Sequence, residues 1–414
     1  MIATRCPGSS ALPILSGIIP GGMSKRDEPR NPFRYGALAF DEAFTDRERE
    51  LRELKADIRN GQDVVVFAPR RYGKSSLVLR ALQDLRRQGV LSAQVDLMTA
   101  PTKEKLAEKL AKAIHEGIAS PLYRARERAL GVFRGLRITP TVTIDPEDSS
   151  VSFGFEPGRA PADVDATVER LLTLPGELAA DRGRVVALVL DEFQEVVEID
   201  PNLPKLMRAV FQAQPEVAHV YLGSKRHMMR SIFNDENEPF WRSAKQVELD
   251  VIRPDLFAPF IVERFRSTAK RIDDEAVETV LAKTAGHPYA TQELCYFTWE
   301  ATDLRSTAAP LHVRVGLEGV LRSEHAHFSL IWEDASAAQR LLLGALAAEP
   351  GRPYTEEYRR RHRLPPVTNV QRALTGLLRR ELVAKTGDGA YEIVEPFLAE
   401  WVVRTVDPAR GNAR

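Results

Sequence analysis

Short apolar runs alternate along most of the chain with amphipathic stretches of helical period. The run DVVVFA, residues 63–68, is almost wholly apolar, and SAQVDL, RVVALVLDE, AHVYLGS and AKQVELD are further strand candidates. Such strands are typical of a sheet covered on both faces. The stretch KSSLVLRALQDLRRQG puts four apolar residues on one helical face: Leu77, Ala81, Leu82 and Leu85. Strands alternating with helices predict a parallel, doubly wound α/β sheet.

This alternation is interrupted once and then ends. Residues 136–158 alternate apolar and polar on both sides of a DPEDSS turn, which predicts an inserted β-hairpin whose role is left open. Residues 251–330 predict a helical lid without strands. Residues 331–406 read as three helices followed by a small hairpin that turns at GDG, the order of a winged-helix domain. We therefore expect an α/β core at 31–250, then the lid, then the winged-helix domain.

The two ends of the chain lack this pattern. Residues 1–30 hold a weak apolar stretch broken by Pro13 and Pro20, whereas a secretory signal needs an unbroken apolar core. We expect a disordered tail there, with Met23 as an alternative start. A second short tail is expected at 407–414.

Composition narrows the classes of function. Lys plus Arg number 58 and Asp plus Glu 58, so the net charge is zero, and nucleic-acid affinity would need a local basic patch. Cys6 and Cys295 give neither a disulfide framework nor a metal-ligand spacing, which suits a reducing compartment. The apolar runs are too short to span a bilayer. We expect a cytoplasmic protein without a membrane partner.

The stretch APRRYGKSS, residues 68–76, lies between the first apolar strand and a helix. This order suits a phosphate-binding loop, because loop N–H groups and the positive end of the helix dipole then face the anion. Lys74 would reach the β- and γ-phosphates of a nucleotide, and the Ser75 hydroxyl would ligand Mg²⁺. The expected nucleotide-binding residues are Pro69, Arg70, Arg71, Tyr72, Gly73, Lys74, Ser75 and Ser76.

One position departs from the pattern G-x-x-x-x-G-K-[ST]. Ala68 stands where the first glycine is usual, so the alternative is a basic turn that matches by chance. Ala68 occupies the end of the strand, where a small residue suffices if its φ stays negative. The flanking strand and helix favour a nucleotide site.

A second apolar strand, VVALVL at 185–190, runs directly into Asp191 and Glu192. An acid at the C-terminal end of a buried parallel strand faces the crevice where open α/β sheets bind ligands. Asp191 would hold Mg²⁺ through water, opposite Ser75, and Glu192 would orient and deprotonate the attacking water. The plain alternative is an acid pair that caps a helix. The phosphate loop upstream favours the catalytic interpretation.

Five segments together resemble a known family: APRRYGKSS, LVLDEFQEV, YLGSKRHMM, PFWRSAKQVELDVI and GHPYATQEL. They are similar to the archaeal-type ATPases, which belong with the AAA+ and STAND groups of P-loop NTPases. The resemblance extends over nearly the whole chain outside the tails, and the double-arginine loop and DEFQE are its most specific parts. It implies ATP as the nucleotide, Mg²⁺ as its metal and ATP hydrolysis as the activity.

The resemblance also implies roles near the nucleotide. Phe44 and Arg47 match the segment that packs beside the adenine, although an aromatic residue before a helix is more often part of the core. Ser224 matches a polar sensor on the strand beside the acid strand, and its alternative is a helix N-cap. His287 and Pro288 of the GHP stretch match a lid motif that approaches the nucleotide; without the resemblance they are a turn between helices.

An arginine is also implied at the γ-phosphate. Arg242 matches the arginine that precedes the last strand and could stabilise charge there, in its own subunit or in a neighbouring one. Arg226 competes for this role. A surface cation is the alternative for Arg242.

In the predicted winged-helix domain, TNVQ at 368–371 predicts a capping box at a helix start. Val370, Leu374, Leu377 and Leu378 would form the buried face of this helix. The outward residues are of the types that contact phosphates and bases in a major groove: Asn369, Arg372, Thr375 and Arg379. Winged helices also bind proteins, so double-stranded DNA and a protein partner both stay open.

The sequence thus predicts an ATPase whose nucleotide cycle moves a lid and a winged-helix domain. It would act on DNA, or assemble with itself as an ATP-dependent oligomer. The alternative is a DNA-binding or protein-interaction switch that holds ATP or ADP as a slowly turned-over structural ligand. The carboxylate of Glu192 argues against that alternative, because a purely structural site does not need it.

Overall fold

The structure, a computed structural model, describes residues 29–36, 47–122, 130–138, 140–144, 151–155 and 160–406. The expectations for residues 1–28, for Phe44 and for the tail at 407–414 fall outside the described residues. They stay predictions.

A five-stranded parallel sheet forms the core, with the strand order β2–β5–β6–β1–β7. Its members are β1 (Val64–Phe67), β2 (Leu91–Asp96), β5 (Val186–Asp191), β6 (Val217–Gly223) and β7 (Lys245–Glu248). β6 lies between the strand of the phosphate loop and the strand of the acid pair. The predicted parallel α/β sheet is confirmed.

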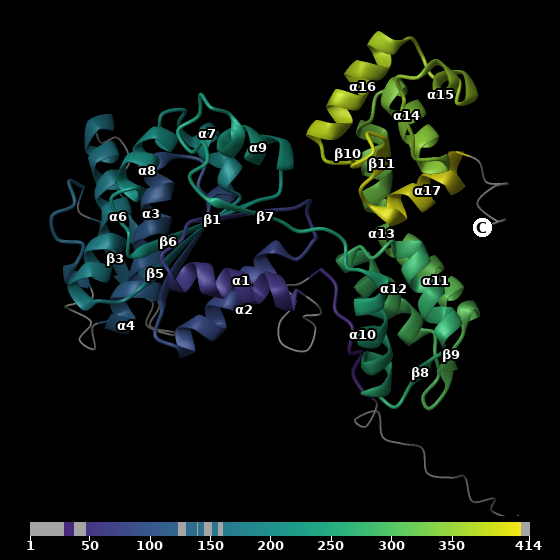
Figure 1. Cartoon of the computed structure of the whole chain (residues 1–414), viewed down its shortest axis with the longest axis horizontal. Coiled ribbons are helices and arrows are strands. Elements are labelled where there is room, and N and C mark those ends of the chain that lie inside the picture. Colours follow the sequence, from purple (N-terminus) through teal and green to yellow (C-terminus); the bar gives the residue numbers. More distant parts are fainter. Residues whose placement is uncertain are drawn as a thin grey trace, which may run out of the picture.

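Helices cover both faces of this sheet (Figure 1). On one face, α1 (Glu48–Arg59) and α2 (Lys74–Arg87) pack against Val64 and Val66 of β1. On the other, Val65 and Phe67 join a cluster built from α3 (Lys103–Ile114), α6 (Pro161–Arg182), α8 (Leu203–Phe211) and α9 (Arg226–Asn234). Alternate strand residues point to opposite faces, so a wholly apolar strand serves both clusters. The sheet is doubly wound, as predicted.

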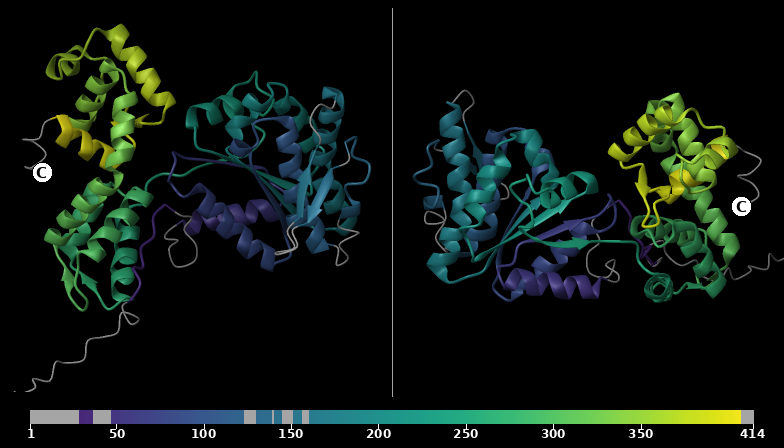
Figure 2. Two further views of the ribbon diagram at one scale, coloured as in Figure 1. Left: turned by 180° about the vertical axis from the view of Figure 1, so that it is seen from behind. Right: turned by 45° about the horizontal axis from the view of Figure 1, so that its top comes forward.

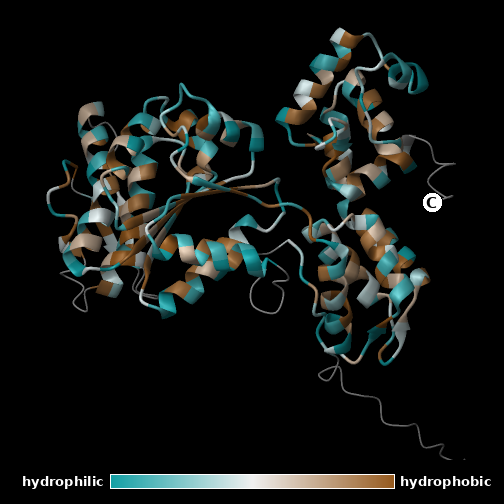
Figure 3. Cartoon of the chain, in the orientation of Figure 1, coloured by the Kyte–Doolittle hydropathy of each residue, from teal (hydrophilic) through white to brown (hydrophobic). Residues whose placement is uncertain are grey.

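The colouring by hydropathy follows this arrangement, with apolar strands inside and polar helix faces outside (Figure 3). All residues of β1 and β6 are buried. Short helical turns complete the core: η2 (Leu97–Thr99), η3 (His115–Ala119), α4 (Ser120–Leu122), η4 (Phe193–Glu195) and α7 (Val196–Ile199).

The insertion contains the expected antiparallel pair, β3 (Thr141–Ile144) and β4 (Val151–Gly154). Phe153 of β4 is buried against Phe133 and His115, so the hairpin is packed onto the core. The DPEDSS turn lies outside the described residues.

Residues 251–330, here called the helical unit, lie beside the α/β core (Figure 2). The helices are α10 (Pro254–Arg266), α11 (Asp274–Thr284), α12 (Pro288–Glu300) and α13 (Pro310–Asp334). The expectation of no strands is wrong in one detail, since β8 (Arg271–Ile272) and β9 (Thr307–Ala308) pair in parallel. Two-residue strands have no periodic pattern that a sequence could reveal.

The predicted winged-helix order is confirmed at the C-terminal end. It consists of α14 (Ala337–Ala348), α15 (Glu356–Arg361), α16 (Val367–Arg379), β10 (Val383–Lys385), β11 (Tyr391–Ile393) and α17 (Pro396–Val406). The helix α13 continues into this part, and its buried residues join those of the helical unit in one cluster. The apolar clusters of the α/β core contain no residue beyond Leu249. The helical unit and the winged-helix domain therefore share a core of their own.

The predicted capping box at the start of α16 is wrong. The helix begins at Val367 after Pro366, whose carbonyl accepts from the backbone N–H groups of Asn369 and Val370. Thr368 is thus already inside the first turn. The proline pair 365–366 fixes the start of the helix by its restricted φ rather than by a side-chain cap.

Within the described part of the chain, no helix has the length and apolar character needed to cross a membrane.

Candidate functional site

The phosphate loop joins β1 to α2 at the C-terminal edge of the sheet. Gly73 has φ +87° and is the N-cap of α2, so the loop turns sharply into the helix N-terminus. Arg71 also has a positive φ, +68°. A non-glycine residue in this conformation is uncommon and is held there by its surroundings.

Ala68 fits the loop as expected. It is fully buried at the end of β1 and is not among the residues with positive φ, so glycine is not required there. Its backbone N–H donates to the carbonyl of Gly223, which ties the loop to the end of β6.

The loop and the acid strand meet at Ser75. Its Oγ donates a hydrogen bond to Asp191 Oδ2 at 3.3 Å. Burial raises the pKa of Asp191, and the negative charge of Glu192 adds to the rise. A carboxylate and a hydroxyl at this spacing are oxygen donors of the kind that Mg²⁺ prefers, with waters and phosphate oxygens completing its shell. Among the described residues, no three acidic, histidine or cysteine side chains gather as a metal cage.

Lys74 is buried at the start of α2, and only 6% of the residue is exposed. Burial lowers the pKa of its ammonium, and the nearby carboxylates of Glu192 and Asp191 oppose that change. A cation kept out of water in this way interacts strongly with an anion that enters the site.

Glu192 is held by three hydrogen bonds on one carboxylate oxygen. Its Oε2 accepts from Gln194 Nε2 at 2.5 Å, from Ser224 Oγ at 2.7 Å and from Ser224 N at 3.4 Å. Burial alone would raise the pKa of Glu192, but the hydrogen bonds from Gln194 and Ser224 outweigh it and lower the pKa. Among the described residues, the hydrogen bonds to the Glu192 carboxylate all end on Oε2. Glu192 occupies the N-cap position of η4, but its side chain makes no capping hydrogen bond there.

The helix-cap alternative for Ser224 is wrong. The N-cap of α9 is Lys225, and the hydroxyl of Ser224 instead donates a hydrogen bond to Glu192. Gln194 was not singled out from the sequence. It is fully buried behind Glu192, and the only signal was a glutamine within DEFQE.

Arg47 is buried at the start of α1, in a left-handed conformation. Its guanidinium donates to the backbone carbonyl of Asp250 and pairs with Glu50 at 3.4 Å. Arg47 thus links α1 to the segment that leads into the helical unit. Phe44, its expected companion in the base pocket, lies outside the described residues.

The two candidate arginines lie at opposite ends of the parallel strands, Arg226 at the C-terminal ends and Arg242 at the N-terminal ends. Arg226 follows the C-terminal end of β6, and its charge acts on Tyr72 of the phosphate loop. Arg242 precedes β7, whose residues run parallel to β1 from Lys245 opposite Val64. It is exposed, and its guanidinium lies 5.4 Å from the ring of Trp241. Within one chain, Arg242 is therefore remote from the phosphate loop.

The GHP stretch contacts the phosphate loop directly. The ring of His287 packs against Tyr72, with centroids 4.7 Å apart, and His287 caps α12 through the N–H of Ala290. Pro288 is the first residue of that helix. Burial, together with the charge of Arg71, lowers the pKa of His287 to about 4, so the ring is neutral at physiological pH.

Two glutamates of the winged-helix domain also reach the loop, and sequence reasoning missed both. Glu381 Oε2 lies 3.9 Å from Arg70 Nε, and Glu395 Oε2 lies 3.5 Å from Arg71 Nη1. Burial raises the pKa of each carboxyl to about 7. Nothing in the local sequence distinguishes them from other surface acids.

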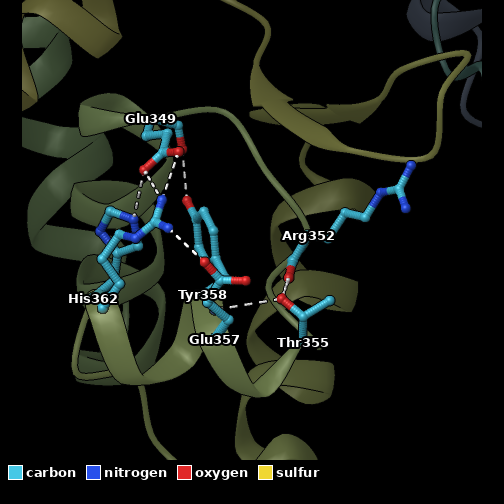
Figure 4. A network of polar contacts seen from close by, with 7 residues as sticks. Glu349, Arg352, Thr355, Glu357, Tyr358 and His362 are labelled. Atoms are coloured by element: carbon cyan, nitrogen blue, oxygen red, sulfur yellow. Dashed lines mark hydrogen bonds and ion pairs between the residues drawn. The ribbon is translucent and has the colours of Figure 1, made fainter.

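The outward residues of α16 are exposed as predicted: Asn369, Arg372, Thr375 and Arg379. Residues 358–363, YRRRHR, form a basic cluster whose charge is partly neutralised by nearby glutamates (Figure 4). Glu349 binds Arg361 at 2.9 Å and His362 at 3.4 Å, and Glu357 also binds Arg361. Burial lowers the pKa of His227 in α9, and the charges of Lys225 and Arg379 add to this change.

Comparison with solved structures supports the fold. The Walker-type ATPase PABY2304 of Pyrococcus abyssi matches with a TM-score of 0.64 at 17% identity, over 90% of this chain and 99% of that one. The ORC2 protein of Aeropyrum pernix, in its ADPNP–ADP complexes, matches with a TM-score of 0.54 at 13% identity, over 93% and 99%. At these identities the likeness concerns the fold alone. Among curated proteins, no sequence matches.

Family models give the assignment. Residues 326–404 match a probable winged helix domain. Residues 44–294, more than half of the chain, match the ATPase domain found predominantly in Archaea. The phosphate loop, the acid strand and the contacts of Glu192 all lie inside that match, and the chain belongs to this family of ATPases.

Proposed function

We propose that this protein binds Mg·ATP at the C-terminal edge of the sheet and hydrolyses it. The observation that carries the proposal is the group formed by Lys74, Ser75, Asp191 and Glu192, with Ser75 bonded to Asp191 and Glu192 oriented by its neighbours. These are the parts that phosphoryl transfer to water needs.

Each residue has a part that follows from its position. The backbone N–H groups of the loop and of the α2 N-terminus bind the phosphates, and Lys74 adds a buried positive charge. Ser75 and Asp191 hold Mg²⁺, which supplies neutralising charge for the phosphate oxygens. Glu192 positions a water molecule and accepts its proton, with Ser224 and Gln194 keeping the carboxylate ionised.

An arginine would stabilise the negative charge that develops on the γ-phosphate during hydrolysis. Arg226 serves from the same chain, since it lies at the edge of the sheet that holds the phosphate loop. Arg242 serves only from a neighbouring subunit, because it lies at the other edge. In that arrangement turnover requires an oligomer of the chain.

The nucleotide cycle moves the helical unit and the winged-helix domain as one body. Their shared apolar core, and its separation from the clusters of the α/β core, support this part of the proposal. The exposed face of α16 then presents Asn369, Arg372 and Thr375 to double-stranded DNA. A regulatory switch with slow turnover is the second candidate, favoured by the contacts of the winged-helix domain with the phosphate loop.

The test is ATP turnover by the wild type beside Lys74→Ala and Glu192→Gln, with and without double-stranded DNA. Glu198→Gln is the matched control, because Glu198 is an exposed acid just downstream of the acid strand. We expect turnover in the wild type and the control, and its loss in the other two variants. Wild-type turnover no faster than that of Lys74→Ala would refute hydrolysis.

A further inference from the structure

The winged-helix domain reaches the phosphate loop through two carboxylates. Glu381 follows α16 and Glu395 precedes α17, so both belong to connections at the ends of helices. They lie 3.9 Å from Arg70 and 3.5 Å from Arg71, respectively. Two neighbouring arginines of one loop are thus paired with two acids from the same distant domain.

Arg71 contacts residues of the helical unit and of the winged-helix domain. Its guanidinium lies 4.2 Å from the ring centroid of Tyr289 on α12, in addition to its ion pair with Glu395. On the same helix, Glu293 is fully buried, and its carboxyl interacts with that of Glu324 on α13. Burial and the charges of Glu324 and Glu395 raise the pKa of Glu293 to about 9. The positive charge of Arg71 opposes these rises, since it lowers the pKa values of Glu293 and Glu395.

Glu381 faces the centre of the proposed nucleotide site. Its charge interacts with those of Lys74 and Glu192 as well as with that of Arg70. It has φ +57°, just beyond the C-terminal end of α16, where glycine is the usual residue. This conformation ends the helix: the N–H of Leu382 donates to the carbonyl of Leu377, and the N–H of Glu381 donates to the carbonyl of Leu378.

The phosphates of a nucleotide and these carboxylates seek the same cations. Arg70, Arg71 and Lys74 belong to the loop that cradles the phosphates. A γ-phosphate placed beside Lys74 would bring its negative charge close to Glu381, and like charges at short range in a partly buried site repel strongly. The nucleotide phosphates and the two carboxylates therefore compete for the same cations of the loop.

We propose that Glu381 and Glu395 are internal competitors of nucleotide phosphate: they pair with Arg70 and Arg71, and the phosphates of ATP displace them, which releases the winged-helix domain from the loop. The inference rests on the proposed function and names the residues that regulate it. The winged-helix domain thereby opposes ATP binding in this chain, and it supplies no phosphate ligand.

The test compares ATP affinity in Glu381→Gln and Glu395→Gln with the wild type, by titration of a fluorescent ATP analogue with Mg²⁺ at pH 8. Allosteric couplings commonly reach about 5- to 150-fold, and we expect each variant to bind about fivefold tighter. Glu357→Gln is the control, because Glu357 is an exposed acid of the same domain, paired with Arg361. Its affinity should equal that of the wild type. Thermal unfolding of all four proteins verifies that they fold.

A second measurement follows the release itself. Small-angle X-ray scattering of the wild type should show a larger radius of gyration with a non-hydrolysable ATP analogue than with buffer alone. Unchanged or weaker ATP binding in both glutamine variants would overturn the inference, since the carboxylates would then orient the arginines for phosphate. If the wild type and Lys74→Ala both fail to bind ATP, the proposed function fails first, and that result is distinct from the other.

Discussion

The two sides of the phosphate loop are built differently. Towards the sheet, hydrogen bonds of 2.7–3.3 Å join Ser75, Asp191, Glu192 and Ser224, which lie at the start of α2 and at the C-terminal ends of β5 and β6. Towards the winged-helix domain, the contacts are ion pairs of 3.5 and 3.9 Å with partly exposed arginines. Exposed ion pairs contribute little to stability and are easily exchanged. One side therefore suits fixed chemistry, and the other suits a contact that is made and broken.

The largest effect is expected from the sheet side. Glu192→Gln removes the proposed base while keeping its shape, and general base catalysis contributes about 10²- to 10⁴-fold. Turnover measured by phosphate release should fall by about that factor, while ATP binding is retained. If Glu192→Gln keeps more than a tenth of wild-type turnover, Glu192 is not the general base.

Removing the hydrogen bonds that hold Glu192 should have the next largest effect on turnover. Ser224→Ala and Gln194→Leu each remove a hydrogen bond to a charged group, which contributes about 1.5–3 kcal/mol. We expect turnover to fall about tenfold or more. Because these bonds lower the pKa of Glu192, their loss raises it, and the acidic limb of the pH–rate profile should move to higher pH. Ser231→Ala, an exposed serine on α9, should leave the profile unchanged.

The two arginines distinguish action within one chain from action between chains. Arg226→Ala should lower turnover at every protein concentration, because Arg226 lies beside the loop of its own chain. Arg242→Ala should abolish only the part of the activity that rises more than linearly with concentration. Linear wild-type turnover across a hundredfold dilution series would remove Arg242 from the mechanism.

The winged-helix side should respond to pH, with the smallest effect. Glu381 and Glu395 have pKa values raised to about 7, and that of Glu293 is raised to about 9. A carboxyl with a raised pKa in the closed arrangement favours that arrangement while protonated, so the contact weakens as pH rises from about 5 to about 9. The groups that face these carboxyls are Arg70, Arg71, Lys74, Glu192, Arg226, Tyr289 and Glu324.

Scattering without nucleotide is the measurement for this pH effect. The radius of gyration should increase from pH 5.5 to pH 8.5 in the wild type. The increase should be smaller in Glu293→Gln, whose side chain stays neutral over this range. A decrease with rising pH would show that the ion pairs, and not the cost of burying the acids, dominate the contact.

The sequence predicts the sheet side of the phosphate loop better than the winged-helix side. The strand, loop and helix around Lys74 and the acids after β5 were predictable, because buried parallel strands and phosphate loops have local patterns. The orientation of Glu192 by Gln194 was not, since it depends on side-chain packing behind the strand end. The partners Glu381 and Glu395 lie more than 300 residues from the loop, and no periodicity connects them to it.

The wrong predictions from the sequence also have local structural causes. The capping box at 368–371 was overridden by the proline pair before it, and β8 and β9 are too short to leave a pattern. The position of Arg242 could not be read from the sequence either, because only the parallel pairing of β7 with β1 shows at which end of the strands the residue lies. Its role stays a prediction.

The most direct test of the account measures Glu192→Gln and Glu381→Gln side by side for Mg·ATP affinity and single-turnover hydrolysis. The account predicts opposite defects: Glu192→Gln binds ATP but loses hydrolysis, whereas Glu381→Gln binds ATP more tightly and hydrolyses it at the wild-type rate or faster. If both variants lose hydrolysis to the same extent without a gain in affinity, Glu381 belongs to the catalytic side, and the division between fixed chemistry and a displaceable contact is contradicted.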